Sequence, residues 1–372
     1  MYSGASARQV AIVHVAESFG GGVASAIRDY ARNAPEFEHR LIYAERAEAP
    51  IGPDETADFS GAMLMPHGHL ARVSWIKDYI GKSGESVILH AHSSLAGAYV
   101  RLAVRASSTP IVYTPHCYSF ERRTSSPAVK AVHRFAEWVF SFNTTVFAAC
   151  SRREANLSQW LLSQATVVLV PNVAPIRGEG RKGLTEAASA PLLVAGAGRL
   201  SAQKDPKFFA DTVSALRESG YSIRAQWIGG GDESMVEMLE GTGITVTGWQ
   251  SRDAGLRLLA EADVYVHTAA WEGFPVALLE SISLGVPVVA RAIPALNGIN
   301  LPLVMRKPED AVAFWHRLGT KHQREIVLQA CQRSVENNTD RSQATALSRA
   351  YSHGLKQLNL HQDRNEPYFT KF

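Results

Sequence analysis

At 372 residues, the chain is long enough for two domains that each bury a core of their own. Its composition is that of an ordinary globular protein, with 46% hydrophobic and 20% charged residues, and a net charge of +3 gives no indication of nucleic-acid binding. The three cysteines are widely spaced and odd in number, which argues against a disulfide framework or a zinc knuckle and favours a reducing compartment.

The first apolar run, residues 9–16, is short and interrupted by His14, so it is typical of a buried strand rather than a signal peptide. No window approaches the roughly 18 apolar residues that a membrane-spanning helix needs. We therefore expect a cytoplasmic protein.

Short β-branched runs alternate with helix-length segments along the whole chain. In the first half they predict strands at 9–16, 39–44, 86–92, 109–114, 144–149 and 166–170, and helices near 23–33, 70–80, 95–106, 127–141 and 151–160. In the second half they predict strands at 191–197, 222–230, 244–248, 262–269 and 286–291, and helices near 205–219, 232–240, 253–261 and 275–284. Continuous apolar strands separated by helices indicate parallel sheets covered on both faces, so the fold class is α/β with two doubly wound domains.

The domain boundary is visible in the composition. Residues 174–190 are rich in glycine, charge and small side chains and lack a period, which is typical of a linker. We therefore place the N-terminal domain at 1–173 and the C-terminal domain at 191–354, followed by a helical tail.

Ligands of open α/β sheets bind beyond the carboxyl ends of the strands, so the loops after strands are the candidate sites. One such loop opens the segment WEGFPVALLESISLGVP (271–287), where Pro275 suits the first position of a helix and Gly285 its end. The helix N-terminus would bind phosphate through the backbone amides of its first turn, those of Phe274, Val276 and Ala277.

Two carboxylates flank this helix start, Glu272 before it and Glu280 inside it. Beside a phosphate they would repel it, so we expect them to face a neutral, hydroxyl-rich group such as a sugar or a ribose. The alternative is that Glu272 interacts with the helix dipole and Glu280 is a solvated helix residue.

The loop 196–205 follows the first strand of the second domain and carries Arg199 and Lys204, before a helix that Asp205 caps with Pro206 at its first position. Two fixed cations at the mouth of a parallel sheet suit a diphosphate, and they would neutralise a departing phosphate without a metal. The alternative is that they are ordinary surface charges.

The glycines at 20–22 follow the first strand, where they would let the backbone approach a ligand closely. A dinucleotide fingerprint would also lie here, but Ser25 stands where a Gly or Ala is expected. A structural tight turn fits the same residues.

Histidines follow two strands of the first domain. His116 would polarise or position a reacting hydroxyl group, or it is structural. His90 and His92 project from one face of a strand end, as metal ligands would, but no third ligand of suitable spacing is visible. We therefore expect no metal site.

Eight basic residues between Arg101 and Arg153 stand against two acidic ones, and residues 118–142 mix aromatic and apolar side chains with Lys130 and Arg134 at helical spacing. From this pattern we raise the hypothesis of weak, reversible association with an anionic membrane surface through 118–142. The alternative is a helix that simply covers the sheet.

Glu272 and Glu280, with seven residues between them, resemble the E-x7-E motif of glycosyltransferase family 4. The glycine turn at 20–22, the segment VPNVAP (170–175) and the loop GRLSAQKDP (198–206) are similar to the same family in the same order. The resemblance covers nearly the whole chain and is strongest over 194–291.

The resemblance implies a GT-B fold, with two Rossmann-like domains facing across a cleft and a last helix, about 355–372, packing back onto the first domain. It implies a hexosyl transfer with retention, without a metal or other cofactor, from a UDP- or GDP-type sugar to a glycan or lipid-linked acceptor. A role in bacterial surface polysaccharide synthesis, peripheral to the inner face of the membrane, fits this reading.

Residue by residue, the resemblance assigns the diphosphate to Arg199 and Lys204, the transferred sugar to Glu272 and the reacting carbon's surroundings to His116. It assigns donor binding to Gly21, Gly22, Gly230, Phe274, Pro275, Val276, Ala277 and Glu280, with Glu280 on the ribose. Departures from the family are Asp205 after Lys204, Cys117 after His116, and the loop 290–298.

Two other functions stay open. An NAD-dependent oxidoreductase with two Rossmann domains would use the glycine turn at 20–22 but leave Arg199, Lys204 and Glu280 unexplained. A catalytically inactive GT-B protein that binds sugar nucleotides would keep the donor residues and lose the acceptor side.

Overall fold

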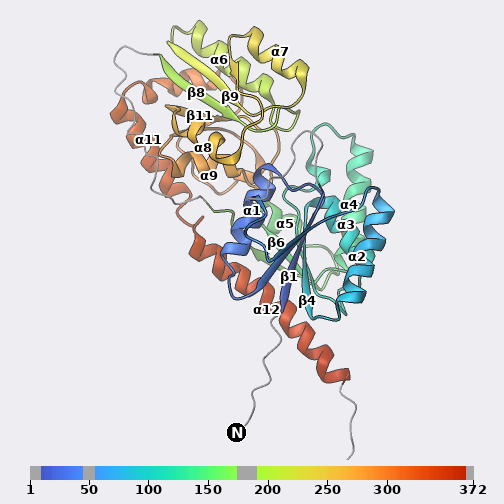
Figure 1. The fold of residues 1–372 in the computed structure, drawn as a ribbon. Helices are drawn as coiled ribbons and strands as arrows, with labels where there is room; N and C mark the ends of the chain where they lie inside the picture. The colour runs from blue at the N-terminus through green and yellow to red at the C-terminus, as the bar shows by residue number, and fades with distance from the viewer. Residues whose placement is uncertain (1–9, 45–54, 174–190, 366–372) are drawn as a thin grey trace, which may run out of the picture. The chain divides into compact units, whose positions relative to one another are not determined.

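The computed structural model describes residues 10–44, 55–173 and 191–365, the side chains of 359–365 excepted. The chain divides into two compact units: unit 1 holds residues 1–121, 125–171 and 340–372, and unit 2 holds 122–124 and 172–339 (Figure 1). The predicted linker at 174–190 lies outside the described residues. Within those residues, every helix is too short or too polar to span a bilayer.

Unit 1 is built on a seven-stranded sheet with the order β3-β2-β1-β4-β5-β6-β7, and every pair of neighbouring strands is parallel. The strands are β1 (Ala11–Ala16), β2 (Glu38–Tyr43), β3 (Gly61–Leu64), β4 (Val87–His92), β5 (Ile111–Thr114), β6 (Val146–Ala149) and β7 (Thr166–Leu169). Strands β1, β4, β5 and β6 are buried along their whole length, as continuous apolar runs predict.

The helices of unit 1 are α1 (Gly21–Arg32), α2 (His69–Ser83), α3 (Ser93–Ala103), α4 (Pro127–Ser141), α5 (Arg152–Leu157) and α12 (Asp340–Asn365). Ser126 caps α4 through the backbone amide of Val129, with Pro127 in the first turn. The long helix α12 packs Leu347, Ala350 and Tyr351 into one core cluster with side chains of β1, β4 and β5. Its start at Asp340 is earlier than the expected start near 355.

Unit 2 has a six-stranded parallel sheet with the order β10-β9-β8-β11-β12-β13. Its strands are β8 (Leu192–Ala197), β9 (Ile223–Ile228), β10 (Thr245–Val246), β11 (Val264–His267), β12 (Val288–Arg291) and β13 (Val304–Met305). Its helices are α6 (Pro206–Glu218), α7 (Glu233–Gly241), α8 (Arg252–Ala260), α9 (Val276–Ser283), α10 (Asp310–Trp315) and α11 (Lys321–Ser334).

Each sheet reverses its strand order at one place, between β1 and β4 in unit 1 and between β8 and β11 in unit 2. In doubly wound sheets such a switch point opens a crevice at the carboxyl ends of the strands, and ligands bind there. The two doubly wound α/β domains that the sequence predicts are therefore confirmed, and the fold directs attention to the loops after β1, β4, β8 and β11.

Candidate functional site

The loops after β8 and β11 are joined at the switch point of unit 2. The Lys204 ammonium forms an ion pair with the Glu272 carboxylate. Gln203 donates its side-chain amide to the carbonyl of Trp271 at 3.1 Å, and the Ala270 amide donates to the carbonyl of Gln203 at 2.8 Å. Two predicted site residues from different loops, Lys204 and Glu272, are thus brought into direct contact.

Glycines let the Arg199 loop lie directly on the turn after β9. A Cβ at Gly229 would meet the carbonyl oxygen of Gly198 at 2.4 Å, and one at Gly231 would meet that of Leu200 at 2.5 Å. Both glycines have positive φ, of 133° and 153°, which other residues rarely adopt. Arg199 itself is exposed.

Gly230 belongs to the same turn, and its immediate neighbour is a side chain of the chain itself. A Cβ there would meet Trp249 at 3.0 Å. A side chain there would need Trp249 to shift slightly, and the predicted donor contact of Gly230 stays a prediction.

Helix α9 begins at Val276, and Pro275 is its N-cap residue rather than its first helical residue. No side chain caps this end of the helix. Phe274 and Val276 are buried and Ala277 is partly exposed, so the first turn of α9 is packed into unit 2 beside Glu272. The helix ends as predicted, since Gly285 follows it with a φ of 82°.

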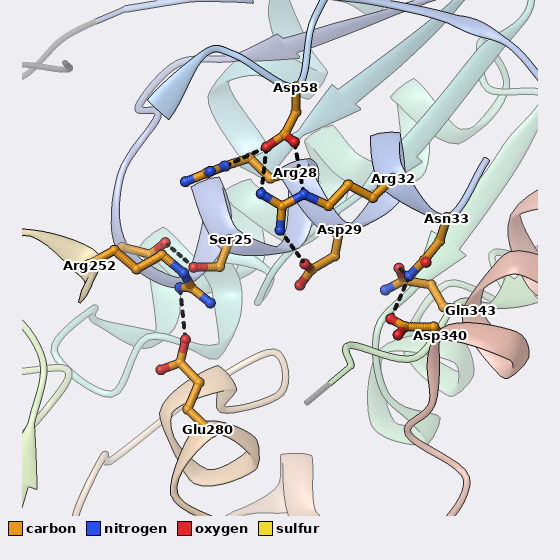
Figure 2. A network of polar contacts seen from close by, with 11 residues as sticks. Ser25, Arg28, Asp29, Arg32, Asn33, Asp58, Arg252, Glu280, Asp340 and Gln343 are labelled. Carbon is orange, nitrogen blue, oxygen red and sulfur yellow. Dashed lines mark hydrogen bonds and ion pairs between the residues drawn. The ribbon is translucent and has the colours of Figure 1, made fainter. Parts of the chain in front are cut away.

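Glu280 forms an ion pair of 2.8 Å with Arg252, the first residue of α8 (Figure 2). The side chains of Glu272 and Glu280 are each only 12% exposed. Burial of a carboxylate is costly unless it is paired, and the chain supplies a cation to each of them. We expected both to face neutral hydroxyl groups; in this structure their partners are Lys204 and Arg252.

Asp205 departs from the family's usual glycine, and its backbone shows why glycine is usual there. Its φ is 50°, in the left-handed region that favours glycine. Asp205 caps α6 by accepting from the Phe208 amide, and its carboxylate accepts from Arg291 at 2.6 Å. Arg291 also donates to the carbonyl of Thr268 and lies 4.1 Å from the centroid of the Phe208 ring. Two departures from the family, at 205 and in the loop 290–298, are therefore in contact.

His267, the last residue of β11, lies under this group of charges. Burial, together with the positive charges of Lys204 and Arg291, lowers the pKa of His267 to about 3. The ring is therefore neutral at physiological pH and adds no charge to the site.

A hollow of about 400 Å³ lies beside these loops in unit 2 and is lined in part by Asp205, Trp271 and Arg291. Its lining does not include Arg199, Lys204, Glu272 or Glu280. The hollow is therefore distinct from the place where the sequence puts the donor phosphates.

The predicted glycine turn of unit 1 forms the start of α1. Gly20 is its N-cap residue, and Gly21, the first helical residue, has a φ of 55°. A Cβ at either glycine would meet nothing within 4 Å. Gly21 and Gly22 are both exposed, so backbone conformation, rather than crowding by the protein, explains the glycine at 21.

His116 lies after β5 and joins a row of four histidine rings that sequence spacing does not reveal. His14, His39 and His92 come from three neighbouring strands, β1, β2 and β4, and the nitrogens of adjacent rings are 2.9 to 3.1 Å apart. Burial lowers the pKa of each of the three, and it lowers the pKa of His116 to about 3. The rings are therefore neutral.

The structure places a third histidine, His14, beside the candidate metal ligands His90 and His92. Ring nitrogens of His14, His90 and His92 lie within 4.8 Å of one another, a distance at which three imidazoles could hold a metal ion. His14 escaped the sequence search because β1 and β4 are neighbours in the sheet and far apart in the chain. Both nitrogens of His90 already face hydroxyl groups, those of Tyr351 at 3.0 Å and Thr114 at 2.9 Å.

The backbone after His116 is held by a buried carboxylate. His116 and Cys117 both have positive φ, 50° and 86°. Glu154 of α5 accepts hydrogen bonds from the backbone amides of Cys117 and of Cys150. Burial raises the pKa of Glu154, while these amides favour its charged form.

Comparison with known proteins bears on both units. A family model described as "Glycosyl transferase 4-like domain" matches residues 7–173, and one described as "Glycosyl transferases group 1" matches residues 190–319. The two matches together cover most of the chain.

Two relatives are similar over part or most of the chain. An Escherichia coli protein named UDP-Gal:alpha-D-GlcNAc-diphosphoundecaprenol alpha-1,3-galactosyltransferase is 26% identical over 234 residues, which are 57% of this chain and 59% of that protein. The match thus spans less than two thirds of that relative's length. A Klebsiella pneumoniae protein, named as an uncharacterized 41.2 kDa protein in the cps region, is 25% identical over 77% of this chain and 82% of its own length.

Solved structures share the fold at low sequence identity. Anabaena Alr3699/HepE in complex with UDP-glucose gives a TM-score of 0.71 at 15% identity, covering 92% of this chain and 100% of that one. The lipopolysaccharide outer core galactosyltransferase WaaB gives 0.65 at 16% identity, covering 92% and 99%.

Proposed function

Because the chain belongs to glycosyltransferase family 4, whose members have the GT-B fold, we propose that it moves a hexosyl group from a UDP-sugar to a lipid-linked or glycan acceptor. The named activity of the Escherichia coli relative, which uses UDP-Gal, supports this donor class. The UDP-glucose complex of a protein with the same fold supports it too. A GDP-sugar is the competing donor.

The observation that carries the proposal is the meeting of Lys204, Glu272 and the first turn of α9 at the switch point of unit 2. A diphosphate at this place would exchange with Glu272 as the partner of Lys204. Arg199 and Lys204 would then hold the phosphate charge that develops as the sugar leaves. Glu272, freed from its ion pair, would accept hydrogen bonds from hydroxyl groups of the transferred sugar.

The same exchange applies to Glu280. Its carboxylate is held by Arg252 in this structure and would accept hydrogen bonds from the two ribose hydroxyls of a bound nucleotide. The reaction would proceed without a metal, because the cations that neutralise the leaving group belong to the chain, and with retention, as the resemblance to the family implies.

A panel of UDP-sugars, GDP-sugars and NAD, read out by thermal shift, tests the donor, because a ligand that binds the folded state raises the melting temperature. We expect a shift with a UDP-sugar that Lys204→Ala abolishes and that EDTA does not change. A shift with NAD alone would overturn the proposal in favour of an oxidoreductase. Binding of a UDP-sugar without transfer to any acceptor would favour an inactive sugar-nucleotide-binding protein.

For the acceptor, we propose that unit 1 binds a membrane surface through an apolar stripe on α4. Val129, Val132, Phe135, Val139 and Phe142 follow one another at helical spacing and are all exposed. The buried side chains of α4 are polar, Glu137 and Ser141, so this helix does not present its apolar face to the sheet.

The stripe continues onto the turn before β7. Trp138 of α4 donates its indole N–H to the carbonyl of Leu161, and Leu161 and Leu162 are 74% and 73% exposed. An exposed apolar surface of this kind marks an interaction site. The basic residues counted in the sequence contribute less than expected, because Arg101 is buried in an ion pair of 2.9 Å with Glu137.

Co-sedimentation with vesicles tests this surface. We expect binding to anionic vesicles that fades with salt, and a loss of roughly tenfold or more in Val132→Ser with Phe135→Ser, because each side chain contributes about 1.5–3 kcal/mol when it is fully buried. Ile326→Ser, at an exposed apolar residue of α11, is the matched control and should bind as the wild type does. If Arg122→Glu with Arg123→Glu and the α4 variant both leave binding unchanged, a soluble acceptor is indicated.

A further inference from the structure

The four histidine rings of unit 1 form a continuous hydrogen-bonded row that ends at a backbone carbonyl. His39 Nε2 lies 2.8 Å from the carbonyl oxygen of Ala34, and His39 Nδ1 lies 2.9 Å from His14 Nε2. His14 Nδ1 lies 3.0 Å from His92 Nε2, and His92 Nδ1 lies 3.1 Å from His116 Nε2. Each link joins the Nδ1 of one ring to the Nε2 of the next.

The ring planes agree with hydrogen bonds made in the plane of each ring. Adjacent rings are inclined by 20°, 23° and 28°, and their centroids are 5.2, 5.2 and 5.3 Å apart. Such separations, with nitrogens 2.9 to 3.1 Å apart, describe rings joined edge to edge rather than stacked face to face.

The carbonyl at the end of the row decides every tautomer. A carbonyl oxygen only accepts, so Nε2 of His39 carries the proton and its Nδ1 accepts. His14 must then donate through Nε2 and accept through Nδ1. The same reasoning passes to His92 and then to His116, whose Nε2 is the donor to His92.

The assignment holds only while each ring carries a single proton. Burial disfavours the doubly protonated, charged form of the rings. The pKa of each of the four rings is lowered, chiefly because burial penalises the charged form. A metal ion between His14 and His92 would also have to replace their direct hydrogen bond, since it binds each nitrogen at about 2.0–2.1 Å in place of a proton.

We propose that His14, His39 and His92 are positioning residues that hold His116 as the Nε2–H tautomer and thereby make its Nδ1 a permanent hydrogen-bond acceptor for a substrate hydroxyl. Among the described residues, Nε2 of His116 has His92 as its partner and Nδ1 has none. The residue is partly exposed, and Glu154 accepts a hydrogen bond from the backbone amide of the next residue, Cys117. The ligand class is a neutral sugar hydroxyl group, and this role rests on the proposed glycosyl transfer.

Nitrogen-15 spectroscopy of the full chain with labelled histidine tests the tautomers directly, without turnover, so its outcome is independent of whether transfer is observed. His116→Phe identifies the signals of His116. At neutral pH we expect a protonated Nε2 and an unprotonated Nδ1 for His14, His39, His92 and His116. A protonated Nδ1 on His116, an imidazolium in the row, or a stoichiometric metal that EDTA removes with a change in these signals would overturn the proposal.

Variants at the far end of the row separate positioning from structure. His39→Asn keeps an amide oxygen near the place of Nδ1, and that oxygen can only accept, so it preserves the direction of the row. His39→Phe removes the acceptor and lets His14 reverse. His322→Phe, at an exposed residue of α11, is the control for the substitution itself.

We expect His39→Phe to mix the tautomers of His116 and to lower kcat about 2- to 10-fold, the range that one net hydrogen bond implies, with little change in donor KM. His39→Asn should retain both the tautomer and the rate. Unmixed tautomers in His39→Phe, or mixed tautomers with unchanged kcat in a variant of unchanged melting temperature, would overturn the positioning role.

Discussion

The two switch points of this protein have the same topology and opposite electrostatics. Counted from the first strand of each unit, both sheets share the order 3-2-1-4-5-6. At the β1/β4 edge of unit 1, buried polar groups are neutral imidazoles joined by hydrogen bonds. At the β8/β11 switch point of unit 2, partly buried polar groups form pairs of opposite charges, Lys204 with Glu272 and Asp205 with Arg291.

Both arrangements satisfy the requirement that a buried polar group has a partner, but they respond differently to a ligand. An ion pair holds a cation that a phosphate can take over, because the phosphate offers the same charge as the carboxylate it displaces. A row of neutral rings holds no charge to give up, and its open end suits a neutral hydroxyl group. If the protein transfers a sugar as proposed, the charged half of the nucleotide sugar would therefore be expected to bind at unit 2.

Acidification should separate the two units most strongly. Burial lowers the pKa values of five histidines in unit 1: His14, His39, His90, His92 and His116. Among the described residues of unit 2, it lowers the pKa of His267. Below about pH 6.5 the unfolded chain binds protons that these folded rings exclude, so each ring costs about 1.4 kcal/mol of stability per pH unit. Unit 1 should therefore unfold first as the pH falls through about 6 to 5.

Hydrogen exchange resolved by peptide, corrected for its intrinsic pH dependence, measures this order. Peptides from β1 and β4 should lose protection before those from β8 and β11. Glu154 acts in the opposite sense, because its raised pKa destabilises the charged form at higher pH, but it is one group against five rings. Simultaneous loss of protection in both units would contradict the comparison.

Removing a cation from unit 2 should give the largest effect on catalysis. Arg199→Ala and Lys204→Ala should each lower kcat/KM. The expected loss of transition-state stabilisation is about 2–4 kcal/mol, the range for a preorganised electrostatic group. The melting temperature should change little in Arg199→Ala, whose side chain is exposed, and should fall in Lys204→Ala, because the Glu272 carboxylate, only 12% exposed, loses its cation. Lys207→Ala, whose side chain is 73% exposed, is the matched control. Near-normal turnover in both variants would remove these residues from the site.

Much of the fold follows from the sequence because its signals are local. The capped helix 127–141 was predicted at the bounds that α4 has. Strand β3 was missed because it alternates between partly and fully exposed residues, and β13 because it has two residues. Both lie in short apolar runs, AMLM (62–65) and LPLVM (301–305), but these runs are poor in the β-branched residues by which the other strands were identified.

The sequence identified site residues where they directly follow a predicted strand. It did not identify their partners where these come from another element. Lys204 and Glu272 follow strands that the pattern identifies, and the structure places them in contact. Arg252 and Arg291 come from the start of α8 and the end of β12, and only the fold brings them to Glu280 and Asp205. The histidine row has the same cause, since its members lie on strands that are neighbours in space.

The two carboxylates of unit 2 should separate in kinetics. Glu280→Gln should raise the donor KM several-fold with little change in kcat, because ribose contacts are alike in the ground and transition states. Glu272→Gln should mainly lower kcat, because the transferred sugar is what changes. Initial rates over a range of donor concentrations measure both effects. The opposite assignment of effects would exchange the two roles.

The smallest expected effect concerns Asp205 and Arg291, and a double-mutant cycle on the stability of unit 2 measures it. Asp205→Gly relieves a left-handed φ that costs roughly 1–2 kcal/mol, but it removes the cap of α6 and leaves Arg291 without its carboxylate. These effects oppose each other, so we expect a net change in the stability of unit 2 near zero.

Arg291→Met should destabilise unit 2. The coupling between the two substitutions should be about 1 kcal/mol, because the side chains of Arg291 and Asp205 are only 13% and 30% exposed. The pair Lys207–Asp211 in α6, at 73% and 45% exposure, is the control and should couple by about 0.3–0.5 kcal/mol. Urea unfolding followed by hydrogen exchange of α6 peptides reads all variants on one scale. A coupling no larger than that of the surface pair would mean that Asp205 and Arg291 replaced the family's residues independently, and that the ion pair does not hold the mouth of unit 2 in shape.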